Sequence, residues 1–346
     1  MLRRGAATEA LFAALAGVDR LVLLGDALEL RNQPMAEVLE ASAAFFGALG
    51  EALEGRPLVI VPGNHDHALV ERWLARRGGA LLLEQRIAPK KASDLAAALT
   101  AQLGGGANVE FAYPGVWLAE NVYATHGHFL DVHLTVPTFE RLAIATSGRI
   151  ALGGPRRWND VHSVDDYEAL LSPVYAWALT AAQTGRTGQG PGGGAAVNVW
   201  RTLRAGRAGG FRTRALATAF PLAVSALNAA GFGPLNREVS GEELRRAGLR
   251  AMSEVVERLQ IPARHVVFGH THRAGMLDGD LAAEWLTPNA VQLHNTGSWV
   301  YSSAFLASGD PKSSYWPGSA VLLEDGTPPR LLRLLTDRSS ADLRGG

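Results

Sequence analysis

The sequence predicts an α/β fold with an α-helical insert, and three observations carry this prediction. Short apolar runs typical of buried strands alternate with segments of helical spacing through the first 128 residues. The first two of these runs end in a glycine followed by a polar residue, and open α/β sheets place their ligands at such strand ends. Between residues 129 and 240 the pattern becomes helical and is broken by glycine-rich stretches.

The first 128 residues are predicted to contain β-α-β-α after an opening helix. The expected elements are helix 8–15, strand 20–24, helix 32–53, strand 58–61, helix 68–77, helix 93–103, short strands 109–111 and 116–118, and strand 121–125. Pro34 in the first turn supports the second helix, because proline fits the start of a helix and breaks its interior.

An α-helical insert is predicted at 129–240, between two halves of a core at 1–128 and 241–338. Its expected helices are 139–150, 163–184, 195–207 and 213–230, with a flexible glycine-rich link. Six arginines and no carboxylate fall between Gly185 and Asn236; the arginines are Arg186, Arg201, Arg204, Arg207, Arg212 and Arg214. They favour an anionic partner, either substrate phosphate or an anionic membrane surface, although a solvated face explains them as well.

The C-terminal half of the core is expected to begin with a helix at 241–259 and a buried strand at 266–268. Antiparallel strands are expected around Trp285 and at 291–293, 319–323 and 330–334. Residues 339–346 are predicted to form a flexible tail.

The composition limits the chemistry that the chain can perform. Its 346 residues include 33 Lys and Arg and 33 Asp and Glu, so no net positive charge favours nucleic acid, and no such partner is predicted. The absence of cysteine excludes disulfides and thiolate ligands. Histidine, carboxylate and asparagine side chains are left to bind metals.

Four predicted strand ends offer such side chains. They are Asp26, Asn64, His126, and the pair His270 and His272. This mixture of carboxylate, amide oxygen and imidazole suits Mn, Fe, Co or Zn better than Ca, which prefers oxygen ligands alone. A bridging carboxylate with imidazoles on either side can hold two ions about 3.5–4 Å apart, and a hydroxide between them can attack phosphorus.

Neighbouring residues suggest further roles. His65 would stabilise developing charge or protonate the leaving oxygen, and Asp66 could orient His65. Arg31 and Arg273 flank the motifs and could hold phosphate. His128 could contact substrate or cap a neighbouring residue.

Each motif also has an ordinary structural explanation. Gly25-Asp26 is typical of a turn, and the Gly-Asn-His-Asp stretch at 63–66 is typical of a helix N-cap. The histidines at 126 and 128 could be two loop residues whose hydrogen bonds are satisfied within the fold. The order of the motifs at successive strand ends is what favours a metal site.

This ordered set resembles the calcineurin-like metallophosphoesterase family, whose motifs run Asp-x-His, Gly-Asp, Gly-Asn-His-Asp/Glu, His and Gly-His-x-His. The likeness covers residues 20–67, 121–128 and 265–299. Gly-Asp-x-x-Glu-Leu at 25–30 and Gly-His-Thr-His-Arg at 269–273 look most like the UDP-2,3-diacylglucosamine hydrolase branch. Its lipid specificity is not carried over, because the insert here is much longer and does not align.

The resemblance implies a four-layer α/β/β/α sandwich with two divalent ions, Mn, Fe, Zn or Co, between the sheet ends. It implies that Asp26 bridges the ions and that His272 binds the first. It implies that His65 contacts the phosphate. The implied ligands of the second ion are Asn64, His126 and His270.

The first family motif, Asp-x-His, is absent from the chain. Asp19 is the only aspartate before Asp26, and no histidine precedes His65. We expect the first strand to be missing, through a misassigned start or a truncation rather than true loss. The chain is therefore predicted to hold the second ion better than the first and to be weak or inactive as an enzyme.

The sequence thus predicts a metallophosphoesterase that hydrolyses a phosphomonoester, a phosphodiester or a pyrophosphate, with the insert as a lid. The alternative is a non-catalytic binding or scaffold protein of the same fold, against which the five remaining ligands argue. A cytoplasmic location, with peripheral membrane contact left open, is expected. Residues 1–18 lack the apolar run of a signal peptide, and the uncharged stretch 215–236 is too rich in Ala, Gly and Pro for a membrane span.

Overall fold

The computed structural model describes residues 5–135, 160–184, 241–302, 306 and 309–344. The chain divides into two compact units, one of residues 1–128 and 261–346 and the other of residues 129–260. All the predicted metal ligands belong to the first unit, which is a mixed α/β structure.

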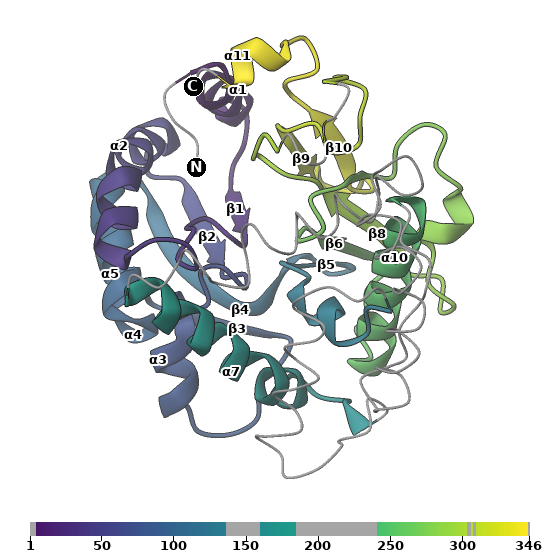
Figure 1. Cartoon of the computed structure of the whole chain (residues 1–346), viewed down its shortest axis with the longest axis horizontal. Helices are drawn as coiled ribbons and strands as arrows, with labels where there is room; N and C mark the ends of the chain where they lie inside the picture. Colours follow the sequence, from purple (N-terminus) through teal and green to yellow (C-terminus); the bar gives the residue numbers. More distant parts are fainter. Residues whose placement is uncertain (1–4, 136–159, 185–240, 303–305, 307–308, 345–346) are drawn as a thin grey trace, which may run out of the picture. The chain divides into compact units, whose positions relative to one another are not determined.

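A curled, mixed sheet of eight strands runs through the first unit (Figure 1). Its strands are β1 (Leu21–Leu24), β2 (Pro57–Val61), β3 (Glu84–Ile87), β4 (Asn108–Ala119), β5 (Val122–Thr125), β6 (His265–Phe268), β7 (Ala274–Gly275) and β8 (Gln292–Thr296). They follow the order β1-β2-β4-β5-β6-β8-β7, and β3 pairs with β4. A separate antiparallel pair consists of β9 (Ser319–Leu322) and β10 (Arg330–Arg333).

The long strand β4 joins two parallel halves of the sheet. Its first part pairs in parallel with β2, and its second part pairs antiparallel with β5. β1 is parallel to β2, and β5, β6 and β8 are parallel to one another. The carboxyl ends of parallel neighbours lie at one edge, so the loops after β1 and β2 are brought together, as are those after β5 and β6.

Hydrophobic burial is uneven across these strands. The apolar run of β2 is buried beyond its first residue, and β5 is buried throughout, because β-branched and aromatic side chains pack on both faces. The four residues of β1 are all half-buried. Within the described part of the chain, β1 has β2 as its single strand partner.

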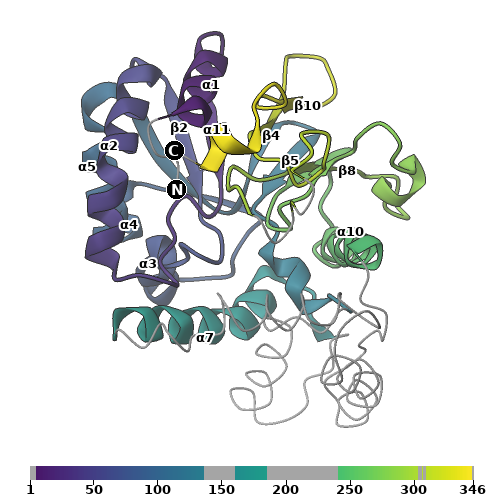
Figure 2. The ribbon, with the colours of Figure 1, turned by 45° about the horizontal axis from the view of Figure 1, so that its top comes forward.

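The helices of the first unit include four that gather along the β1-β2-β4 half of the sheet, α2 to α5 (Figures 1 and 2). The helices of this unit are α1 (Ala6–Leu15), α2 (Met35–Leu53), α3 (Ala68–Arg76), α4 (Pro89–Ala92), α5 (Asp94–Gln102) and α11 (Ser340–Arg344), with 3-10 turns η1 (Gly104–Gly106) and η6 (Ala282–Trp285). In α2 the buried positions Val38, Phe46, Leu49 and Leu53 share one face.

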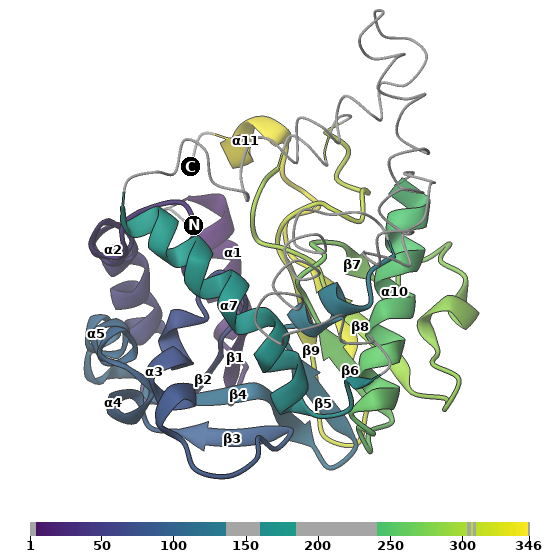
Figure 3. The ribbon, with the colours of Figure 1, turned by 60° about the horizontal axis from the view of Figure 1, so that its bottom comes forward.

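The second unit contains α7 (Val164–Gln183) and α10 (Gly241–Arg258), and the 3-10 turn η2 (His128–Val132) crosses into it. Figure 3 shows α7 as one continuous helix. Ser163 begins it with a capping box, in which Ser163 and Asp166 satisfy each other's backbone N–H groups. The helix predicted at 163–184 is thus present, whereas those at 139–150, 195–207 and 213–230 and the six arginines lie outside the described residues.

Several predicted boundaries differ in the structure. The strands expected at 109–111 and 116–118 are one strand of 12 residues, β4. The helix α10, placed in the core by the sequence, belongs to the second unit, which extends to Gln260. β8, expected to be antiparallel, is parallel to β6, and the expected flexible tail contains α11, which contacts α1.

None of the described helices combines the length and the apolarity that crossing a bilayer demands.

Candidate metal centre

The loops that follow β1 and β2 are tied together by the carboxylate of Asp66. It accepts hydrogen bonds from the backbone N–H groups of residues 26–28 and from that of Gly63, at 2.7–3.3 Å. The N–H of His65 donates to Oδ1 of Asp26 at 2.9 Å. Burial and the nearby charge of Asp26 raise the pKa of Asp66 to about 6, so its carboxylate is largely ionised at neutral pH.

This arrangement corrects the role predicted for Asp66. We predicted that Asp66 orients His65, but its oxygens accept from four backbone N–H groups instead. Asp66 is fully buried and fixes the shape of both loops. The carboxylate that contacts the ring of His65 belongs to Glu29.

His126, directly after β5, presents Nε2 to the centre. Its Nδ1 lies 2.9 Å from the carbonyl oxygen of Leu24, which can only accept, so Nδ1 carries the hydrogen. Nε2 lies 3.2 Å from Oδ2 of Asp26 and 3.2 Å from Oδ1 of Asn64. In the neutral ring, three electron-rich atoms therefore face one another, and a cation or a proton between them would stabilise the group.

Electrostatics favour a positive charge at this point. Burial alone would lower the pKa of His126, but the charge of Asp26 and hydrogen bonds to Asp26 and Leu24 raise it to about 9. Burial alone would raise the pKa of Asp26, yet the charges of His126 and His65 hold it well below its usual range. A proton on His126 can supply the positive charge, and a divalent ion can take its place.

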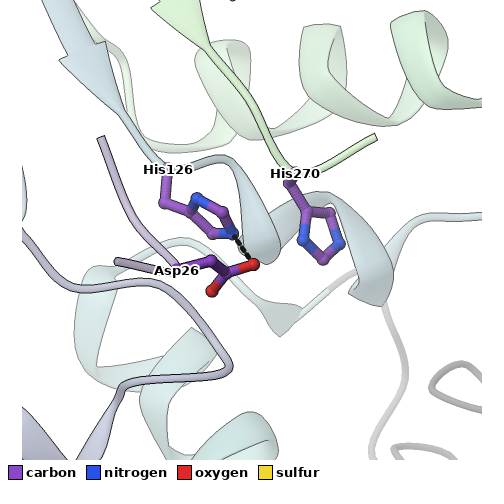
Figure 4. Close-up of side chains that lie close together, drawn as sticks. All are labelled: Asp26, His126 and His270. Atoms are coloured by element: carbon purple, nitrogen blue, oxygen red, sulfur yellow. Dashed lines mark ion pairs between the residues drawn. The ribbon is translucent and has the colours of Figure 1, made fainter. Parts of the chain in front are cut away.

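His270 completes a group that could hold one ion. One ligand atom from each of Asp26, His126 and His270 lies within 4.8 Å of the other two. Figure 4 shows the three side chains reaching from separate segments into one space. The rings of His126 and His270 are 5.2 Å apart and nearly perpendicular, at 77°. In the described part of the chain, no other three His, Asp or Glu side chains bring their ligand atoms this close together.

His272 lies near this group without belonging to it. The charges of Asp26 and His270 act on its ring, and burial lowers its pKa to about 4. His272 is therefore neutral at neutral pH, which is the form that binds metals.

The backbone is strained at three of the predicted ligands. Asp26, His270 and His272 have φ angles of 52°, 63° and 60°. They are three of the six non-glycine residues with positive φ in the described ranges, so this strain is concentrated at the candidate centre. Backbone in this region persists where the surrounding structure enforces it, and it is frequent at functional sites.

Two glycines let the ligands approach the loops closely. A Cβ at Gly25 would lie 2.0 Å from Nδ1 of His126, and a Cβ at Gly63 would lie 2.3 Å from Oδ1 of Asp26. Neither position can accept a larger residue without displacing a ligand. The Gly-Asp and Gly-Asn-His-Asp motifs thus require glycine for steric reasons.

His65, whose charge acts on Asp26, forms a basic pair with Arg31. Nδ1 of His65 lies 2.6 Å from Oε2 of Glu29, and Nε2 lies 3.4 Å from Nη1 of Arg31. Burial would lower the pKa of His65, but the charge of Asp26 and the hydrogen bond to Glu29 raise it. The side chains of His65 and Asp26 keep 27% and 22% of their surface exposed, so a ligand from solvent can reach them.

Arg273, a predicted phosphate-binding residue, is held away from this pair. It is 9% exposed, pairs with Asp280 at 2.5 Å, and stacks its guanidinium 5.3 Å from the ring centre of Trp285. Its charge is already neutralised inside the structure. The prediction that Arg273 binds substrate is therefore not supported.

His128, predicted to contact substrate, is buried next to His126. It is 1% exposed, and its Nε2 lies 3.4 Å from the hydroxyl of Tyr113. Burial and the charges of His126 and His270 keep its pKa well below the usual value. Its ring centroid lies 5.6 Å from that of His126, and a neutral imidazole so deeply buried offers almost no surface to a substrate.

Comparison with known proteins does not assign the chain to a family. A scan against models of protein families finds no match, and a search of curated proteins finds no relative. The function must therefore be argued from the chemistry of the site.

One residue of the centre, Glu29, was not given a role from the sequence. It lies three residues after Asp26, and that spacing was the available signal. For Asn295 the sequence left open whether it lines the site or belongs to a plain turn; it lies in β8 and is 2% exposed. It donates to Oγ1 of Thr271 at 2.8 Å and to the carbonyl of Gly269 at 3.2 Å, which supports the loop of His270 from beneath.

Proposed function

We propose that this site is the centre of a metal-dependent phosphoester hydrolase of the calcineurin-like metallophosphoesterase type. The observation that carries the proposal is the convergence of Asp26, His126 and His270, with Asn64 against His126, beside the basic pair of His65 and Arg31. A divalent ion held there would polarise a phosphoryl oxygen and acidify water. The substrate would be an anionic phosphomonoester, phosphodiester or pyrophosphate.

The chain's own residues have separate tasks in this proposal. Arg31 and His65 hold the phosphate, because His65 can place positive charge next to Asp26 and Arg31 lies against His65. His65 also gives a proton to the leaving oxygen, a role favoured by the charge of Asp26 and the hydrogen bond to Glu29, which raise its pKa against the effect of burial. Glu29 fixes the ring of His65 through Nδ1.

The finer architecture belongs to the same proposal. The two halves of the sheet, β1-β2-β4 and β5-β6-β8, would be the inner layers of a four-layer α/β/β/α sandwich. Two ions would share Asp26, the second held by Asn64, His126 and His270 and the first by His272. Because the chain lacks an Asp-x-His motif, we expect one tightly held ion and weak activity.

The test is hydrolysis of a generic aryl phosphodiester by the purified chain with Mn²⁺, together with metal analysis. We expect one Mn²⁺ per chain and slow hydrolysis that EDTA abolishes. His65→Ala should lower kcat about 10²- to 10⁴-fold while the ion stays bound. Asp26→Asn should remove the ion, and the exposed Asp19→Asn is the matched control.

The possible outcomes separate the two candidate functions. Mn²⁺ bound through Asp26 without any hydrolysis would favour a non-catalytic binding protein of the same fold. Failure to bind Mn²⁺, Zn²⁺, Fe²⁺ or Co²⁺ would refute the metal centre itself. Two tightly held ions and full activity would refute the prediction that the first metal site is incomplete in this chain.

A further inference from the structure

A second histidine pair lies on the sheet, at the other end of β6 from His270. His265 begins β6, and His294 lies in the neighbouring parallel strand β8. Val267 is opposite His294 in the register, so His265 and His294 are diagonal neighbours on one face. Both side chains are half-buried.

The facing nitrogens of this pair have a separation that suits a shared ion. Nδ1 of His265 lies 3.1 Å from Nε2 of His294, and the ring centroids are 5.3 Å apart. With metal–nitrogen bonds of about 2.0–2.1 Å, two ligands are about 3.3 Å apart in a tetrahedral site and about 2.9 Å apart at right angles. The observed distance falls between these values.

The charge state of the pair also fits ligation. Burial lowers the pKa of His294 to about 4, and burial with the charge of Arg264 lowers that of His265. Both rings are therefore neutral at neutral pH, with a lone pair available on one nitrogen each. The nearby Arg264 weakens the attraction for a cation, so the affinity should be lower than at the centre around Asp26.

We propose that His265 and His294 form a separate binding site for an imidazole-preferring divalent ion, Zn²⁺, Ni²⁺ or Cu²⁺. Two protein nitrogens bind the ion, and water fills the remaining positions. The ion would clamp β6 to β8, the strands that deliver His270 and Asn295. This site is independent of the proposed hydrolase activity.

Zn²⁺ titration by calorimetry of the full chain and four variants tests the proposal. His265→Gln and His294→Gln should each weaken one binding phase at least about tenfold, since even an indirect partner of a ligand contributes that much. Asp26→Asn should remove the other phase and keep this one. The exposed His162→Gln is the control and should change neither phase.

A second measurement does not depend on the folding of variants. Cu²⁺ added to the wild-type protein beyond the amount that fills the tighter centre around Asp26 should broaden the ring proton resonances of His265 and His294, and the electron paramagnetic resonance signal that appears in this second step should show two coordinated nitrogens. If the Zn²⁺ binding phase is unchanged in either histidine variant, or if the two resonances are not broadened, the proposed metal site is wrong. The two histidines would then form only a hydrogen bond. Because Asp26→Asn reports the other centre separately, failure of one site is distinguishable from failure of the other.

Discussion

Which ring nitrogen carries a hydrogen decides what each histidine of the metal centre can do. In His126 the carbonyl of Leu24 takes the hydrogen of Nδ1, which leaves Nε2 for a ligand. In His65 the carboxylate of Glu29 accepts the hydrogen of Nδ1. The carbonyl holds the hydrogen on Nδ1 of His126, so Nε2 faces Asp26, where a divalent ion can take the place of the second proton. The carboxylate of Glu29 instead raises the pKa of His65, which favours its protonated form and hence a role as acid.

Glu29→Gln should therefore lower the pKa of His65. The substitution keeps the size of the side chain but removes the charge that helps to raise this pKa. NMR titration of the metal-free protein would show a lower midpoint for His65, and kcat should fall about 10- to 100-fold with the bound metal unchanged. The same substitution at exposed Glu37 is the control, and an unshifted His65 midpoint would contradict the role of Glu29.

Individual side chains were predictable to different degrees. Asp26, Asn64, His126 and His270 could be brought together from the sequence, because each follows a strand end. The ion pair of Arg273 with Asp280 could not be predicted, because Asp280 lies in the irregular chain between β7 and η6, whose path no sequence pattern indicates. Asp66 was recognised by its motif, but its contacts are to backbone N–H groups, which no sequence pattern displays.

At the scale of elements, the loops after β1 and β2 behave as one unit held by Asp66. We expect Asp66→Asn to destabilise the protein by about 1–3 kcal/mol, because the new amide N–H₂ would face backbone donors. Urea unfolding of both proteins, with Asp19→Asn as the control, measures the difference. A loss of stability no larger than that of the control would show that the loops hold without this carboxylate.

The strands β6 and β8 give the fold a predictable sensitivity to acid. The pKa of His294 is about 4 in the fold and 6.5 by its ordinary value, so between these pH values the unfolded chain binds more protons. Stability from this residue is present above pH 6.5 and is lost as the pH falls towards 4. In metal-free protein, His294→Gln should flatten the fall in unfolding free energy between pH 7 and 5, and His162→Gln should not. Parallel curves would contradict the prediction.

Elements with a clear apolar run and a clear end were predictable, as α7 with its Ser163 cap shows. The single strand β4 was read as two because Pro114 and Gly115 interrupt its pattern, although pairing with β2, β3 and β5 supports it along its length. The helix α11 was missed because contacts with α1 hold a polar segment that alone would fray.

At the scale of the whole molecule, the metal centre should be coupled to folding. Asp26, Asn64, His126 and His270 come from four distant parts of the chain, so an ion that binds them all stabilises only the folded state. We expect Mn²⁺ at about 100 times its Kd to raise the free energy of unfolding by about 2.7 kcal/mol. Urea titrations with Mn²⁺ and with EDTA measure this, and Asp26→Asn should abolish the difference. An equal gain in that variant would place the ion elsewhere.

The pairing of β1 with a single strand among the described residues has a consequence for the protein in concentrated solution. Leu21, Val22, Leu23 and Leu24 are all half-buried, and β2 is the one strand that pairs with them in the described ranges. A strand with one partner can pair through its other edge with an extended chain, and natural proteins usually protect such an edge with charge, proline or a covering loop. Solubility should therefore be limited by strand-to-strand association, and light scattering across a dilution series would report particles that grow with concentration.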